Sequence, residues 1–144
     1  MNYQLEINSN SHLSIQQHLE ASYPNEGCGF FFGREDQNGK RTVLLAEAVP
    51  NSKEGEQSRR FEISPLSYVK GEQKALELGL ALLGIYHSHP NHPAIPSELD
   101  LKQALPYFSY IILSVQGGKA SEMTSWRLNE ETLQFDNEEL LLVN

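Results

Sequence analysis

The order of strand-like and helix-like segments constrains the fold of this chain more than any other feature. Over the first two-thirds of the sequence, apolar segments typical of strands alternate with segments typical of helices, and a strand meander follows. This order predicts an α/β (α+β) domain with a mixed, twisted β-sheet flanked by helices. The predicted strands cover residues 3–7, 28–33, 42–49, 61–63, 82–87, 107–115, 122–128 and 132–135, and the predicted helices cover residues 11–22, 64–80 and 97–105.

Size and charge limit the classes of function. The chain has 144 residues, which predicts one domain spanning residues 1–144, and its 39% of hydrophobic residues allow a packed core without a disulfide or a metal. The net charge is −8, and the acidic end from about residue 129 to 144 contains no Lys or Arg. Nucleic acid, which selects basic surfaces, is therefore not an expected partner.

Cellular location is predicted from segments that the sequence lacks. The first residues show no basic region followed by an apolar run, so no secretory signal is recognised. The longest apolar stretch, around residues 76–86, is too short and too interrupted to span a bilayer. We therefore expect a cytoplasmic protein without a membrane partner.

The segment from residue 86 to 100 carries the residues with the clearest chemistry. His87 and His89 stand two positions apart at the end of a predicted strand, so both imidazoles project to the same side. Three prolines stiffen the following loop, and Asp100 lies one turn into the next predicted helix. Two neutral imidazoles and one carboxylate, with an open fourth position, are the composition of a catalytic zinc site.

Ser97 and Asp100 also have an ordinary structural interpretation. Ser-x-x-acid is a capping box, in which the Ser caps a helix and the acid returns to the backbone N–H of that Ser. We expect that an Asp100 bound to a metal is unable to serve as this reciprocal cap as well. Taken together, the His-x-His pair, the proline-rich loop and the Ser-x-x-Asp spacing favour the metal site.

This combination resembles the signature of the JAMM/MPN metallopeptidases. That signature consists of His-x-His, seven residues and Ser-x-x-Asp, and residues 87–100 match it without a gap. Upstream, Pro-Asn-Glu-Gly-Cys-Gly at residues 24–29 is similar to the Pro-x-Glu-x-Cys-Gly pattern of compact prokaryotic members. Asn51, Phe61, Ile63 and Pro65 also fit the family pattern, and the likeness runs from about residue 13 to 115.

The resemblance implies a fold, a cofactor, site roles and a substrate. It implies an MPN-like domain in which His87, His89 and Asp100 hold one zinc ion, Glu26 is the general base and Ser97 hydrogen-bonds the oxyanion. The implied reaction is hydrolysis of the bond after the C-terminal Gly-Gly of a ubiquitin-like or sulfur-carrier protein. The Gly-Gly tail is then expected to lie as an added strand beside residues 51–59.

Two other classes of function stay open. RadC-like proteins share the His-x-His and Ser-x-x-Asp spacing and are linked to DNA, but their loop usually reads His-Asn-His-Pro-Ser-Gly, and the acidic charge here disfavours DNA. The other class is a non-catalytic MPN scaffold, which typically loses metal ligands. Every motif position is filled in this chain, which favours an enzyme.

Four remaining residues are assigned minor roles. His92 gives the segment a likeness to metallo-β-lactamase-like hydrolases, but their Asp before this His is missing and no His follows it, so we interpret His92 as a loop residue at the mouth of the site. His12 and His18 are expected on the surface of the first helix. Cys28, the only cysteine, is expected to be buried in a strand and inert.

Overall fold

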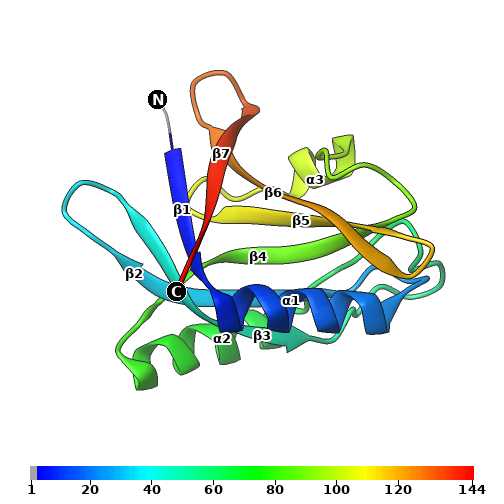
Figure 1. The fold of residues 1–144 in the computed structure, drawn as a ribbon, viewed down its shortest axis with the longest axis horizontal. Coiled ribbons are helices and arrows are strands. Elements are labelled where there is room, and N and C mark those ends of the chain that lie inside the picture. The colour runs from blue at the N-terminus through cyan, green and yellow to red at the C-terminus, as the bar shows by residue number, and fades with distance from the viewer. Residues whose placement is uncertain (1–2) are drawn as a thin grey trace.

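Seven strands and three helices make up the part of the chain that the structure describes, residues 3–144 (Figure 1). The structure is a computed structural model, and Met1 and Asn2, where the predicted domain begins, lie outside the described residues. The elements in chain order are β1 (Tyr3–Asn8), α1 (Ser9–Ser22), β2 (Cys28–Glu35), β3 (Arg41–Val49), α2 (Pro65–Leu78), β4 (Ala81–Pro90), α3 (Glu98–Gln103), β5 (Ser109–Gln116), β6 (Lys119–Asn129) and β7 (Gln134–Val143).

The sheet closes on itself, which goes beyond the predicted mixed, twisted sheet flanked by helices. The strand order is β1-β3-β2-β4-β5-β6-β7, and β7 pairs with β1 in parallel over six residues to form a closed barrel. The predicted last strand, residues 132–135, is wrong in extent, because β7 begins at Gln134 and continues to Val143. The acidic end of the chain is therefore mostly the strand that closes the sheet: residues 134–138 pair with β6 and residues 138–143 pair with β1.

A buried polar network holds this closing strand. The Glu138 carboxylate is only 1% exposed and accepts hydrogen bonds from Arg127 Nε at 2.7 Å and from Ser125 Oγ at 2.7 Å. Ser109 Oγ also donates to Glu138 at 3.2 Å and accepts from Arg41 Nη1 at 2.9 Å. Because a buried charge without partners is strongly unfavourable, these contacts fix β7 against β6 and β5.

We expect Glu138→Gln to lower the free energy of unfolding by about 3–5 kcal/mol, since the variant leaves the Arg127 guanidinium buried without its carboxylate. Glu139 is exposed on the same strand, so Glu139→Gln is a matched control with an expected change below about 0.5 kcal/mol. Urea denaturation of both variants measures the difference. Equal unfolding free energies would contradict a role for the buried network.

The aromatic run of β2 connects the two faces of the sheet. Neighbouring residues of a strand point to opposite faces. Phe31 therefore packs with Ile15 and Leu19 of α1, whereas Phe30 and Phe32 pack in a second cluster that includes Ala75 of α2. Ile15 and Leu19 are both fully buried.

The helix α2 contacts the sheet through small residues rather than through its leucines. A Cβ atom at Gly71 would lie 2.8 Å from the Phe30 ring, so glycine is needed for this close approach. Leu66 and Leu76, whose helical spacing predicted the helix, are 61% and 83% exposed. Gly71 lowers the helix propensity of this segment, but it is also the residue that lets α2 pack closely against the Phe30 ring.

The connection between β4 and β5 positions the candidate site. These strands pair in parallel, so the chain must cross from the end of β4 back to the start of β5. This crossover contains the proline-rich loop 91–96 and α3, which returns Asp100 to the end of β4. None of the helices in residues 3–144 combines the length and hydropathy that a membrane span requires.

Candidate metal centre

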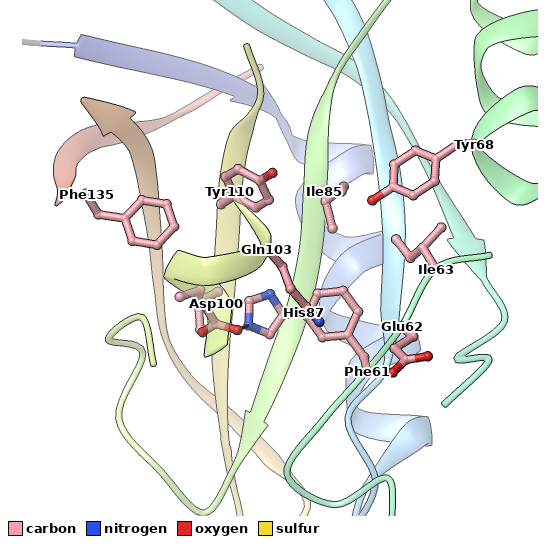
Figure 2. Close-up of a pocket in the computed structure, with 11 residues that line it drawn as sticks. Phe61, Glu62, Ile63, Tyr68, Ile85, His87, Asp100, Gln103, Tyr110 and Phe135 are labelled. Atoms are coloured by element: carbon pink, nitrogen blue, oxygen red, sulfur yellow. Dashed lines mark ion pairs between the residues drawn. The ribbon is translucent and has the colours of Figure 1, made fainter. Parts of the chain in front are cut away.

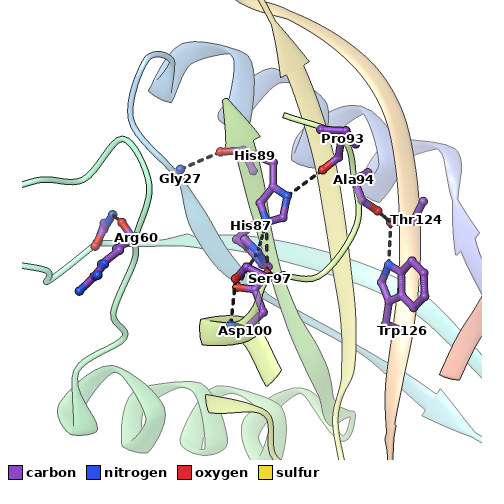
Figure 3. Close-up of polar contacts among 12 residues, drawn as sticks. Gly27, Arg60, His87, His89, Pro93, Ala94, Ser97, Asp100, Thr124 and Trp126 are labelled. Carbon is purple, nitrogen blue, oxygen red and sulfur yellow. Dashed lines mark hydrogen bonds and ion pairs between the residues drawn. The ribbon is translucent and has the colours of Figure 1, made fainter. Parts of the chain in front are cut away.

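The two histidines of β4 and the aspartate of α3 form one cluster (Figure 3). His87 Nε2 and His89 Nε2 are 3.2 Å apart. The Asp100 carboxylate lies against both rings, with Oδ1 3.3 Å from His87 Nε2 and Oδ2 3.2 Å from His89 Nε2. The structure thus brings together the three side chains that the sequence predicted as metal ligands.

The protons of this cluster are arranged in a way that fits a cation. His89 Nδ1 lies 2.8 Å from the carbonyl oxygen of Pro93, which only accepts, so Nδ1 carries the proton and Nε2 of the neutral ring presents a lone pair to the cluster. Ligand atoms on a tetrahedral zinc ion with bonds of about 2.0–2.1 Å are about 3.3 Å apart. The separation of 3.2 Å between the two Nε2 atoms matches this value, and one ligand atom from each of the three residues lies within 4.8 Å of the others, so the three residues are able to hold a divalent metal ion.

Asp100 belongs to the cluster and to the cap of α3 at the same time. Its Oδ2 accepts from the backbone N–H of Ser97 at 2.9 Å, and Ser97 Oγ accepts from the backbone N–H of Asp100 at 3.0 Å. The carboxylate therefore faces both histidines while it serves as the reciprocal cap, because a carboxylate has about four lone-pair sites; the expectation for a metal-bound Asp100 stays a prediction. Burial acts to raise the pKa of Asp100, but the His87 and His89 rings and the Ser97 N–H hold it well below its usual range.

Glu26 reaches the same site from the segment that leads into β2. It is 7% exposed and lines a cavity together with His89 and Ser97. Its backbone is held on both sides, since its N–H donates to Gln57 O at 2.8 Å and its carbonyl accepts from Asn51 Nδ2 at 3.0 Å. Burial raises the pKa of Glu26 to about 8. The positive charge that His89 carries when it is protonated acts to lower this pKa. A buried carboxylate is therefore held beside the cluster.

Ser88, between the two histidines, connects β4 to the Glu26 segment. Its Oγ accepts from Gly27 N–H at 2.9 Å, and its own N–H donates to Gly27 O at 3.2 Å. Ser88 is fully buried. No role for Ser88 was predicted from the sequence. The feature that could have indicated this contact is a small hydroxyl residue between the two histidines, at the position that strand alternation turns away from the candidate metal ligands.

Asn51 joins three segments around the site. Its Nδ2 donates to Glu26 O and Arg60 O, and its Oδ1 accepts from the N–H groups of Lys53 and Glu62. All four hydrogen-bonding positions of the amide are therefore used. From the sequence, Asn51 was recognised only as part of a family pattern, and its hydrogen bonds to three segments were not predicted.

Phe61 is placed on the site rather than in the sheet. The predicted strand at residues 61–63 is wrong, because these residues belong to no strand. Glu62 N–H is bound to the Asn51 side chain, and the Phe61 ring stacks on the His87 ring with centroids 4.5 Å apart and planes at 29°. This stack covers one face of a candidate metal ligand.

Two cavities flank the cluster. The first, about 340 Å³, adjoins His87 and Asp100 (Figure 2). It is mainly aromatic and aliphatic, and its other lining residues include Phe61, Ile63, Tyr68, Tyr110 and Phe135. The second, about 410 Å³, adjoins His89 and Glu26 on the other side of the cluster. Each cavity therefore adjoins at least one of the three candidate ligands.

Of the residues with minor predicted roles, His92 and Cys28 lie as predicted and His18 does not. His92 lines the second cavity, at the mouth of the site as predicted. Cys28 is buried, and burial raises the pKa of its thiol to about 12, which keeps it protonated. The surface position predicted for His18 is wrong: its Nδ1 lies 2.6 Å from Tyr86 Oη, and half-burial lowers its pKa.

The family follows from comparison with known proteins. A family described as prokaryotic homologues of the JAB domain matches residues 9–129, which is most of the chain. The protein therefore belongs to this family, and the resemblance inferred from the motif is confirmed.

Individual relatives agree with this placement. The chain is 38% identical over 104 residues to a probable TtuB-protein conjugate cleaving protease of Thermus thermophilus. It is 32% identical over 106 residues to a desampylase of Pyrococcus furiosus. The alignments cover 72% and 74% of this chain and 65% and 69% of the two relatives, so the chain matches about two-thirds of their length.

Solved structures confirm the fold. A protein of Desulfitobacterium hafniense, 26% identical, superposes with a TM-score of 0.85 over 98% of this chain and 94% of its own. A protein of Salinibacter ruber, 34% identical, gives a TM-score of 0.76 over 96% and 92%. The whole described barrel is therefore an arrangement that relatives share.

Proposed function

We propose that this protein is a zinc-dependent peptidase or isopeptidase that cuts after the C-terminal Gly-Gly of a ubiquitin-like or sulfur-carrier protein. The observation that carries the proposal is that Glu26 and Ser97 line one cavity together with His89, a member of the His87, His89 and Asp100 cluster. The names of the Thermus and Pyrococcus relatives support hydrolysis of protein conjugates.

In this mechanism each side chain has one task. His87, His89 and Asp100 hold the zinc ion, which when bound acidifies water and polarises the scissile carbonyl. Glu26 takes the proton of the attacking water and delivers it to the leaving amine, since its carboxylate lies at the same cavity. Binding of a cation nearby lowers the pKa of Glu26 from about 8 and favours its basic form.

Ser97 is suited to bind the oxyanion. Its Oγ accepts from Asp100 N–H, which leaves the hydroxyl hydrogen free to be donated. The helix cap fixes Ser97 relative to Asp100, so the donor is held in place before the substrate arrives.

The Gly-Gly requirement follows from the enclosed site. Phe61 and the proline-rich loop stand on either side of the cluster, and only glycine lets a substrate backbone approach so closely. Residues 51–59 belong to no strand, so we propose that the tail pairs with this segment by strand addition, as expected from the resemblance. The first, apolar cavity then receives a side chain that precedes the two glycines.

A defined fusion substrate tests the proposal. A ubiquitin-like protein ending in Gly-Gly is joined to a short peptide, incubated with the zinc-loaded protein and analysed by mass spectrometry. We expect one cut after the second Gly, lost on chelation of the metal, and no cut when the last Gly is replaced by Val. A zinc-loaded protein that leaves ubiquitin-like and sulfur-carrier fusions intact contradicts the proposal, and tight DNA binding by it supports the RadC-like alternative.

Ser97→Ala separates the oxyanion role from the capping role. We expect turnover to fall about 10²-fold or more with zinc still bound, because the hydroxyl acts mainly in the transition state. Loss of the cap alone costs about 1 kcal/mol of stability. Thermal melting and single-turnover rates of the same variant measure both effects. A melting shift with nearly unchanged turnover would leave Ser97 as a cap only.

A further inference from the structure

The cavity on the Glu26 side of the cluster contains a positively charged side chain that the proposed mechanism does not use. Its volume is about 410 Å³. Around its inner end lie residues of the proposed mechanism, and its other walls come from two loops. The residues that matter here are Glu26, His89 and Ser97 at the inner end, Arg59 from one loop, and His92 and Ile95 from the other.

This cavity is the leaving-group side of the site. The assignment rests on the proposed function, in which Glu26 delivers a proton to the leaving nitrogen. Proton delivery requires that nitrogen to lie within hydrogen-bond reach of the Glu26 carboxylate. The residues that follow the cut therefore enter the cavity that Glu26 lines, while the Gly-Gly tail arrives past Phe61 from the other cavity.

The wall that carries His92 is held rigidly. The carbonyl of His92 accepts from Ser114 Oγ at 2.6 Å, and the carbonyl of Ala94 accepts from Thr124 Oγ1 at 2.7 Å. Trp126 Nε1 in turn donates to Thr124 Oγ1 at 2.8 Å (Figure 3). Side chains on this loop therefore face the cavity from a fixed backbone, which reduces the cost of ordering them on binding.

Arg59 gives the opposite wall its charge. The two hydrogen bonds from Ser58 and, after them, the charge of Arg59 lower the pKa of Glu56 on the same loop, and no ion pair joins Glu56 to Arg59 among the described residues. Arginine donates two parallel hydrogen bonds to a carboxylate, and its charge does not depend on pH in the accessible range. In a chain of net charge −8, a cation beside the proposed leaving group favours an anionic ligand.

We propose that Arg59, together with His92, binds a carboxylate of the leaving group within one or two residues of the cut. The preferred substrates are then Gly-Gly tails followed by a short C-terminal extension that bears a carboxylate.

Peptides that differ only in the carboxylate test this inference. Carrier proteins ending in Gly-Gly-Ala with a free carboxylate, Gly-Gly-Ala with an amidated end, and Gly-Gly-Asp with an amidated end are compared by kcat/KM. We expect the free acid to exceed the Ala amide by about tenfold or more, as for a charge-assisted bidentate contact. The Asp amide shows whether a side-chain carboxylate substitutes for the terminal one.

Two variants of neighbouring arginines make the test specific. In Arg59→Gln the ratio between the acid and the Ala amide is expected to fall to about one. Arg60, which does not line the cavity, is the matched control, and Arg60→Gln should keep the full ratio. Equal kcat/KM for all three substrates in the wild type overturns the inference while leaving the proposed hydrolysis intact, whereas a wild type that cuts none of them removes the proposed hydrolysis.

A binding measurement decides the inference even without turnover. Alanyl-alanine and its amide are titrated into the zinc-loaded protein, and the Arg59 side-chain Nε–H signal is followed by NMR. We expect this signal to shift with the free acid at a concentration at least about tenfold below that needed for the amide. Equal responses to acid and amide, or an acid response that survives Arg59→Gln, overturn the carboxylate site.

Discussion

Without the His87 imidazole, the protein is expected to lose its zinc and its hydrolytic activity while keeping its fold. His87→Ala removes one of three candidate ligands, and the two that remain do not complete a catalytic zinc site. The fold survives because the two hydrophobic clusters do not contain His87 and the backbone pairing of β4 is unaffected. We expect zinc to fall from about one ion per chain to none, as measured by elemental analysis.

His92→Ala is the matched control for metal content. His92 stands three residues after His89 but lies outside the cluster, so this variant should retain its zinc. Far-UV circular dichroism and thermal melting show whether each variant is folded. Undiminished zinc in a folded His87→Ala protein, or loss of zinc in His92→Ala, would contradict the ligand assignment.

Glu26→Gln is expected to bind zinc and substrate normally and to hydrolyse the substrate about 10²–10⁴-fold more slowly. Glutamine keeps the size of the side chain and the backbone bonds to Gln57 and Asn51, but its neutral amide does not take up a proton at neutral pH. The fall should appear in kcat, since the lost step is proton transfer. Single-turnover kinetics on the Gly-Gly fusion, with zinc content measured in parallel, gives the result.

Glu54→Gln serves as the control, since Glu54 is an exposed acid on the loop after β3 and makes no side-chain contact in the described cluster. It should hydrolyse the fusion at the wild-type rate. If Glu26→Gln is as active as this control, another group acts as the base. If its zinc is lost as well, Glu26 contributes to the metal site and its proton-transfer role is unsupported.

Several tertiary features were accessible from the sequence because they depend on local periodicity. Alternation places His87 and His89 on one side of β4, and the same rule divides the phenylalanines of β2 between the two faces of the sheet. The Ser64-Pro65 start of α2 and the Ser97 cap of α3 follow from helix-terminus preferences. Backbone geometry and hydrogen bonds between residues close in the sequence determine these features, so a short segment is enough to reveal them.

The errors concern contacts between distant segments. A strand was expected at residues 61–63, but Asn51 and the His87 ring hold that segment instead. His18 was expected on the surface, but Tyr86 from another element covers and binds it. In each case the local sequence permits both states, and a partner far along the chain selects one.

The sequence by itself determined the three candidate metal ligands, their chemistry and the alternation of helices and strands. The tertiary structure alone decided that the sheet closes, since closure depends on β7 pairing with β1 and on the buried partners of Glu138. It also decided that Glu26 lines a cavity with a member of the cluster and that Asp100 belongs to the cluster and to the helix cap together. The physical reason is that burial and hydrogen bonding between segments far apart in the chain leave no periodic trace in either segment.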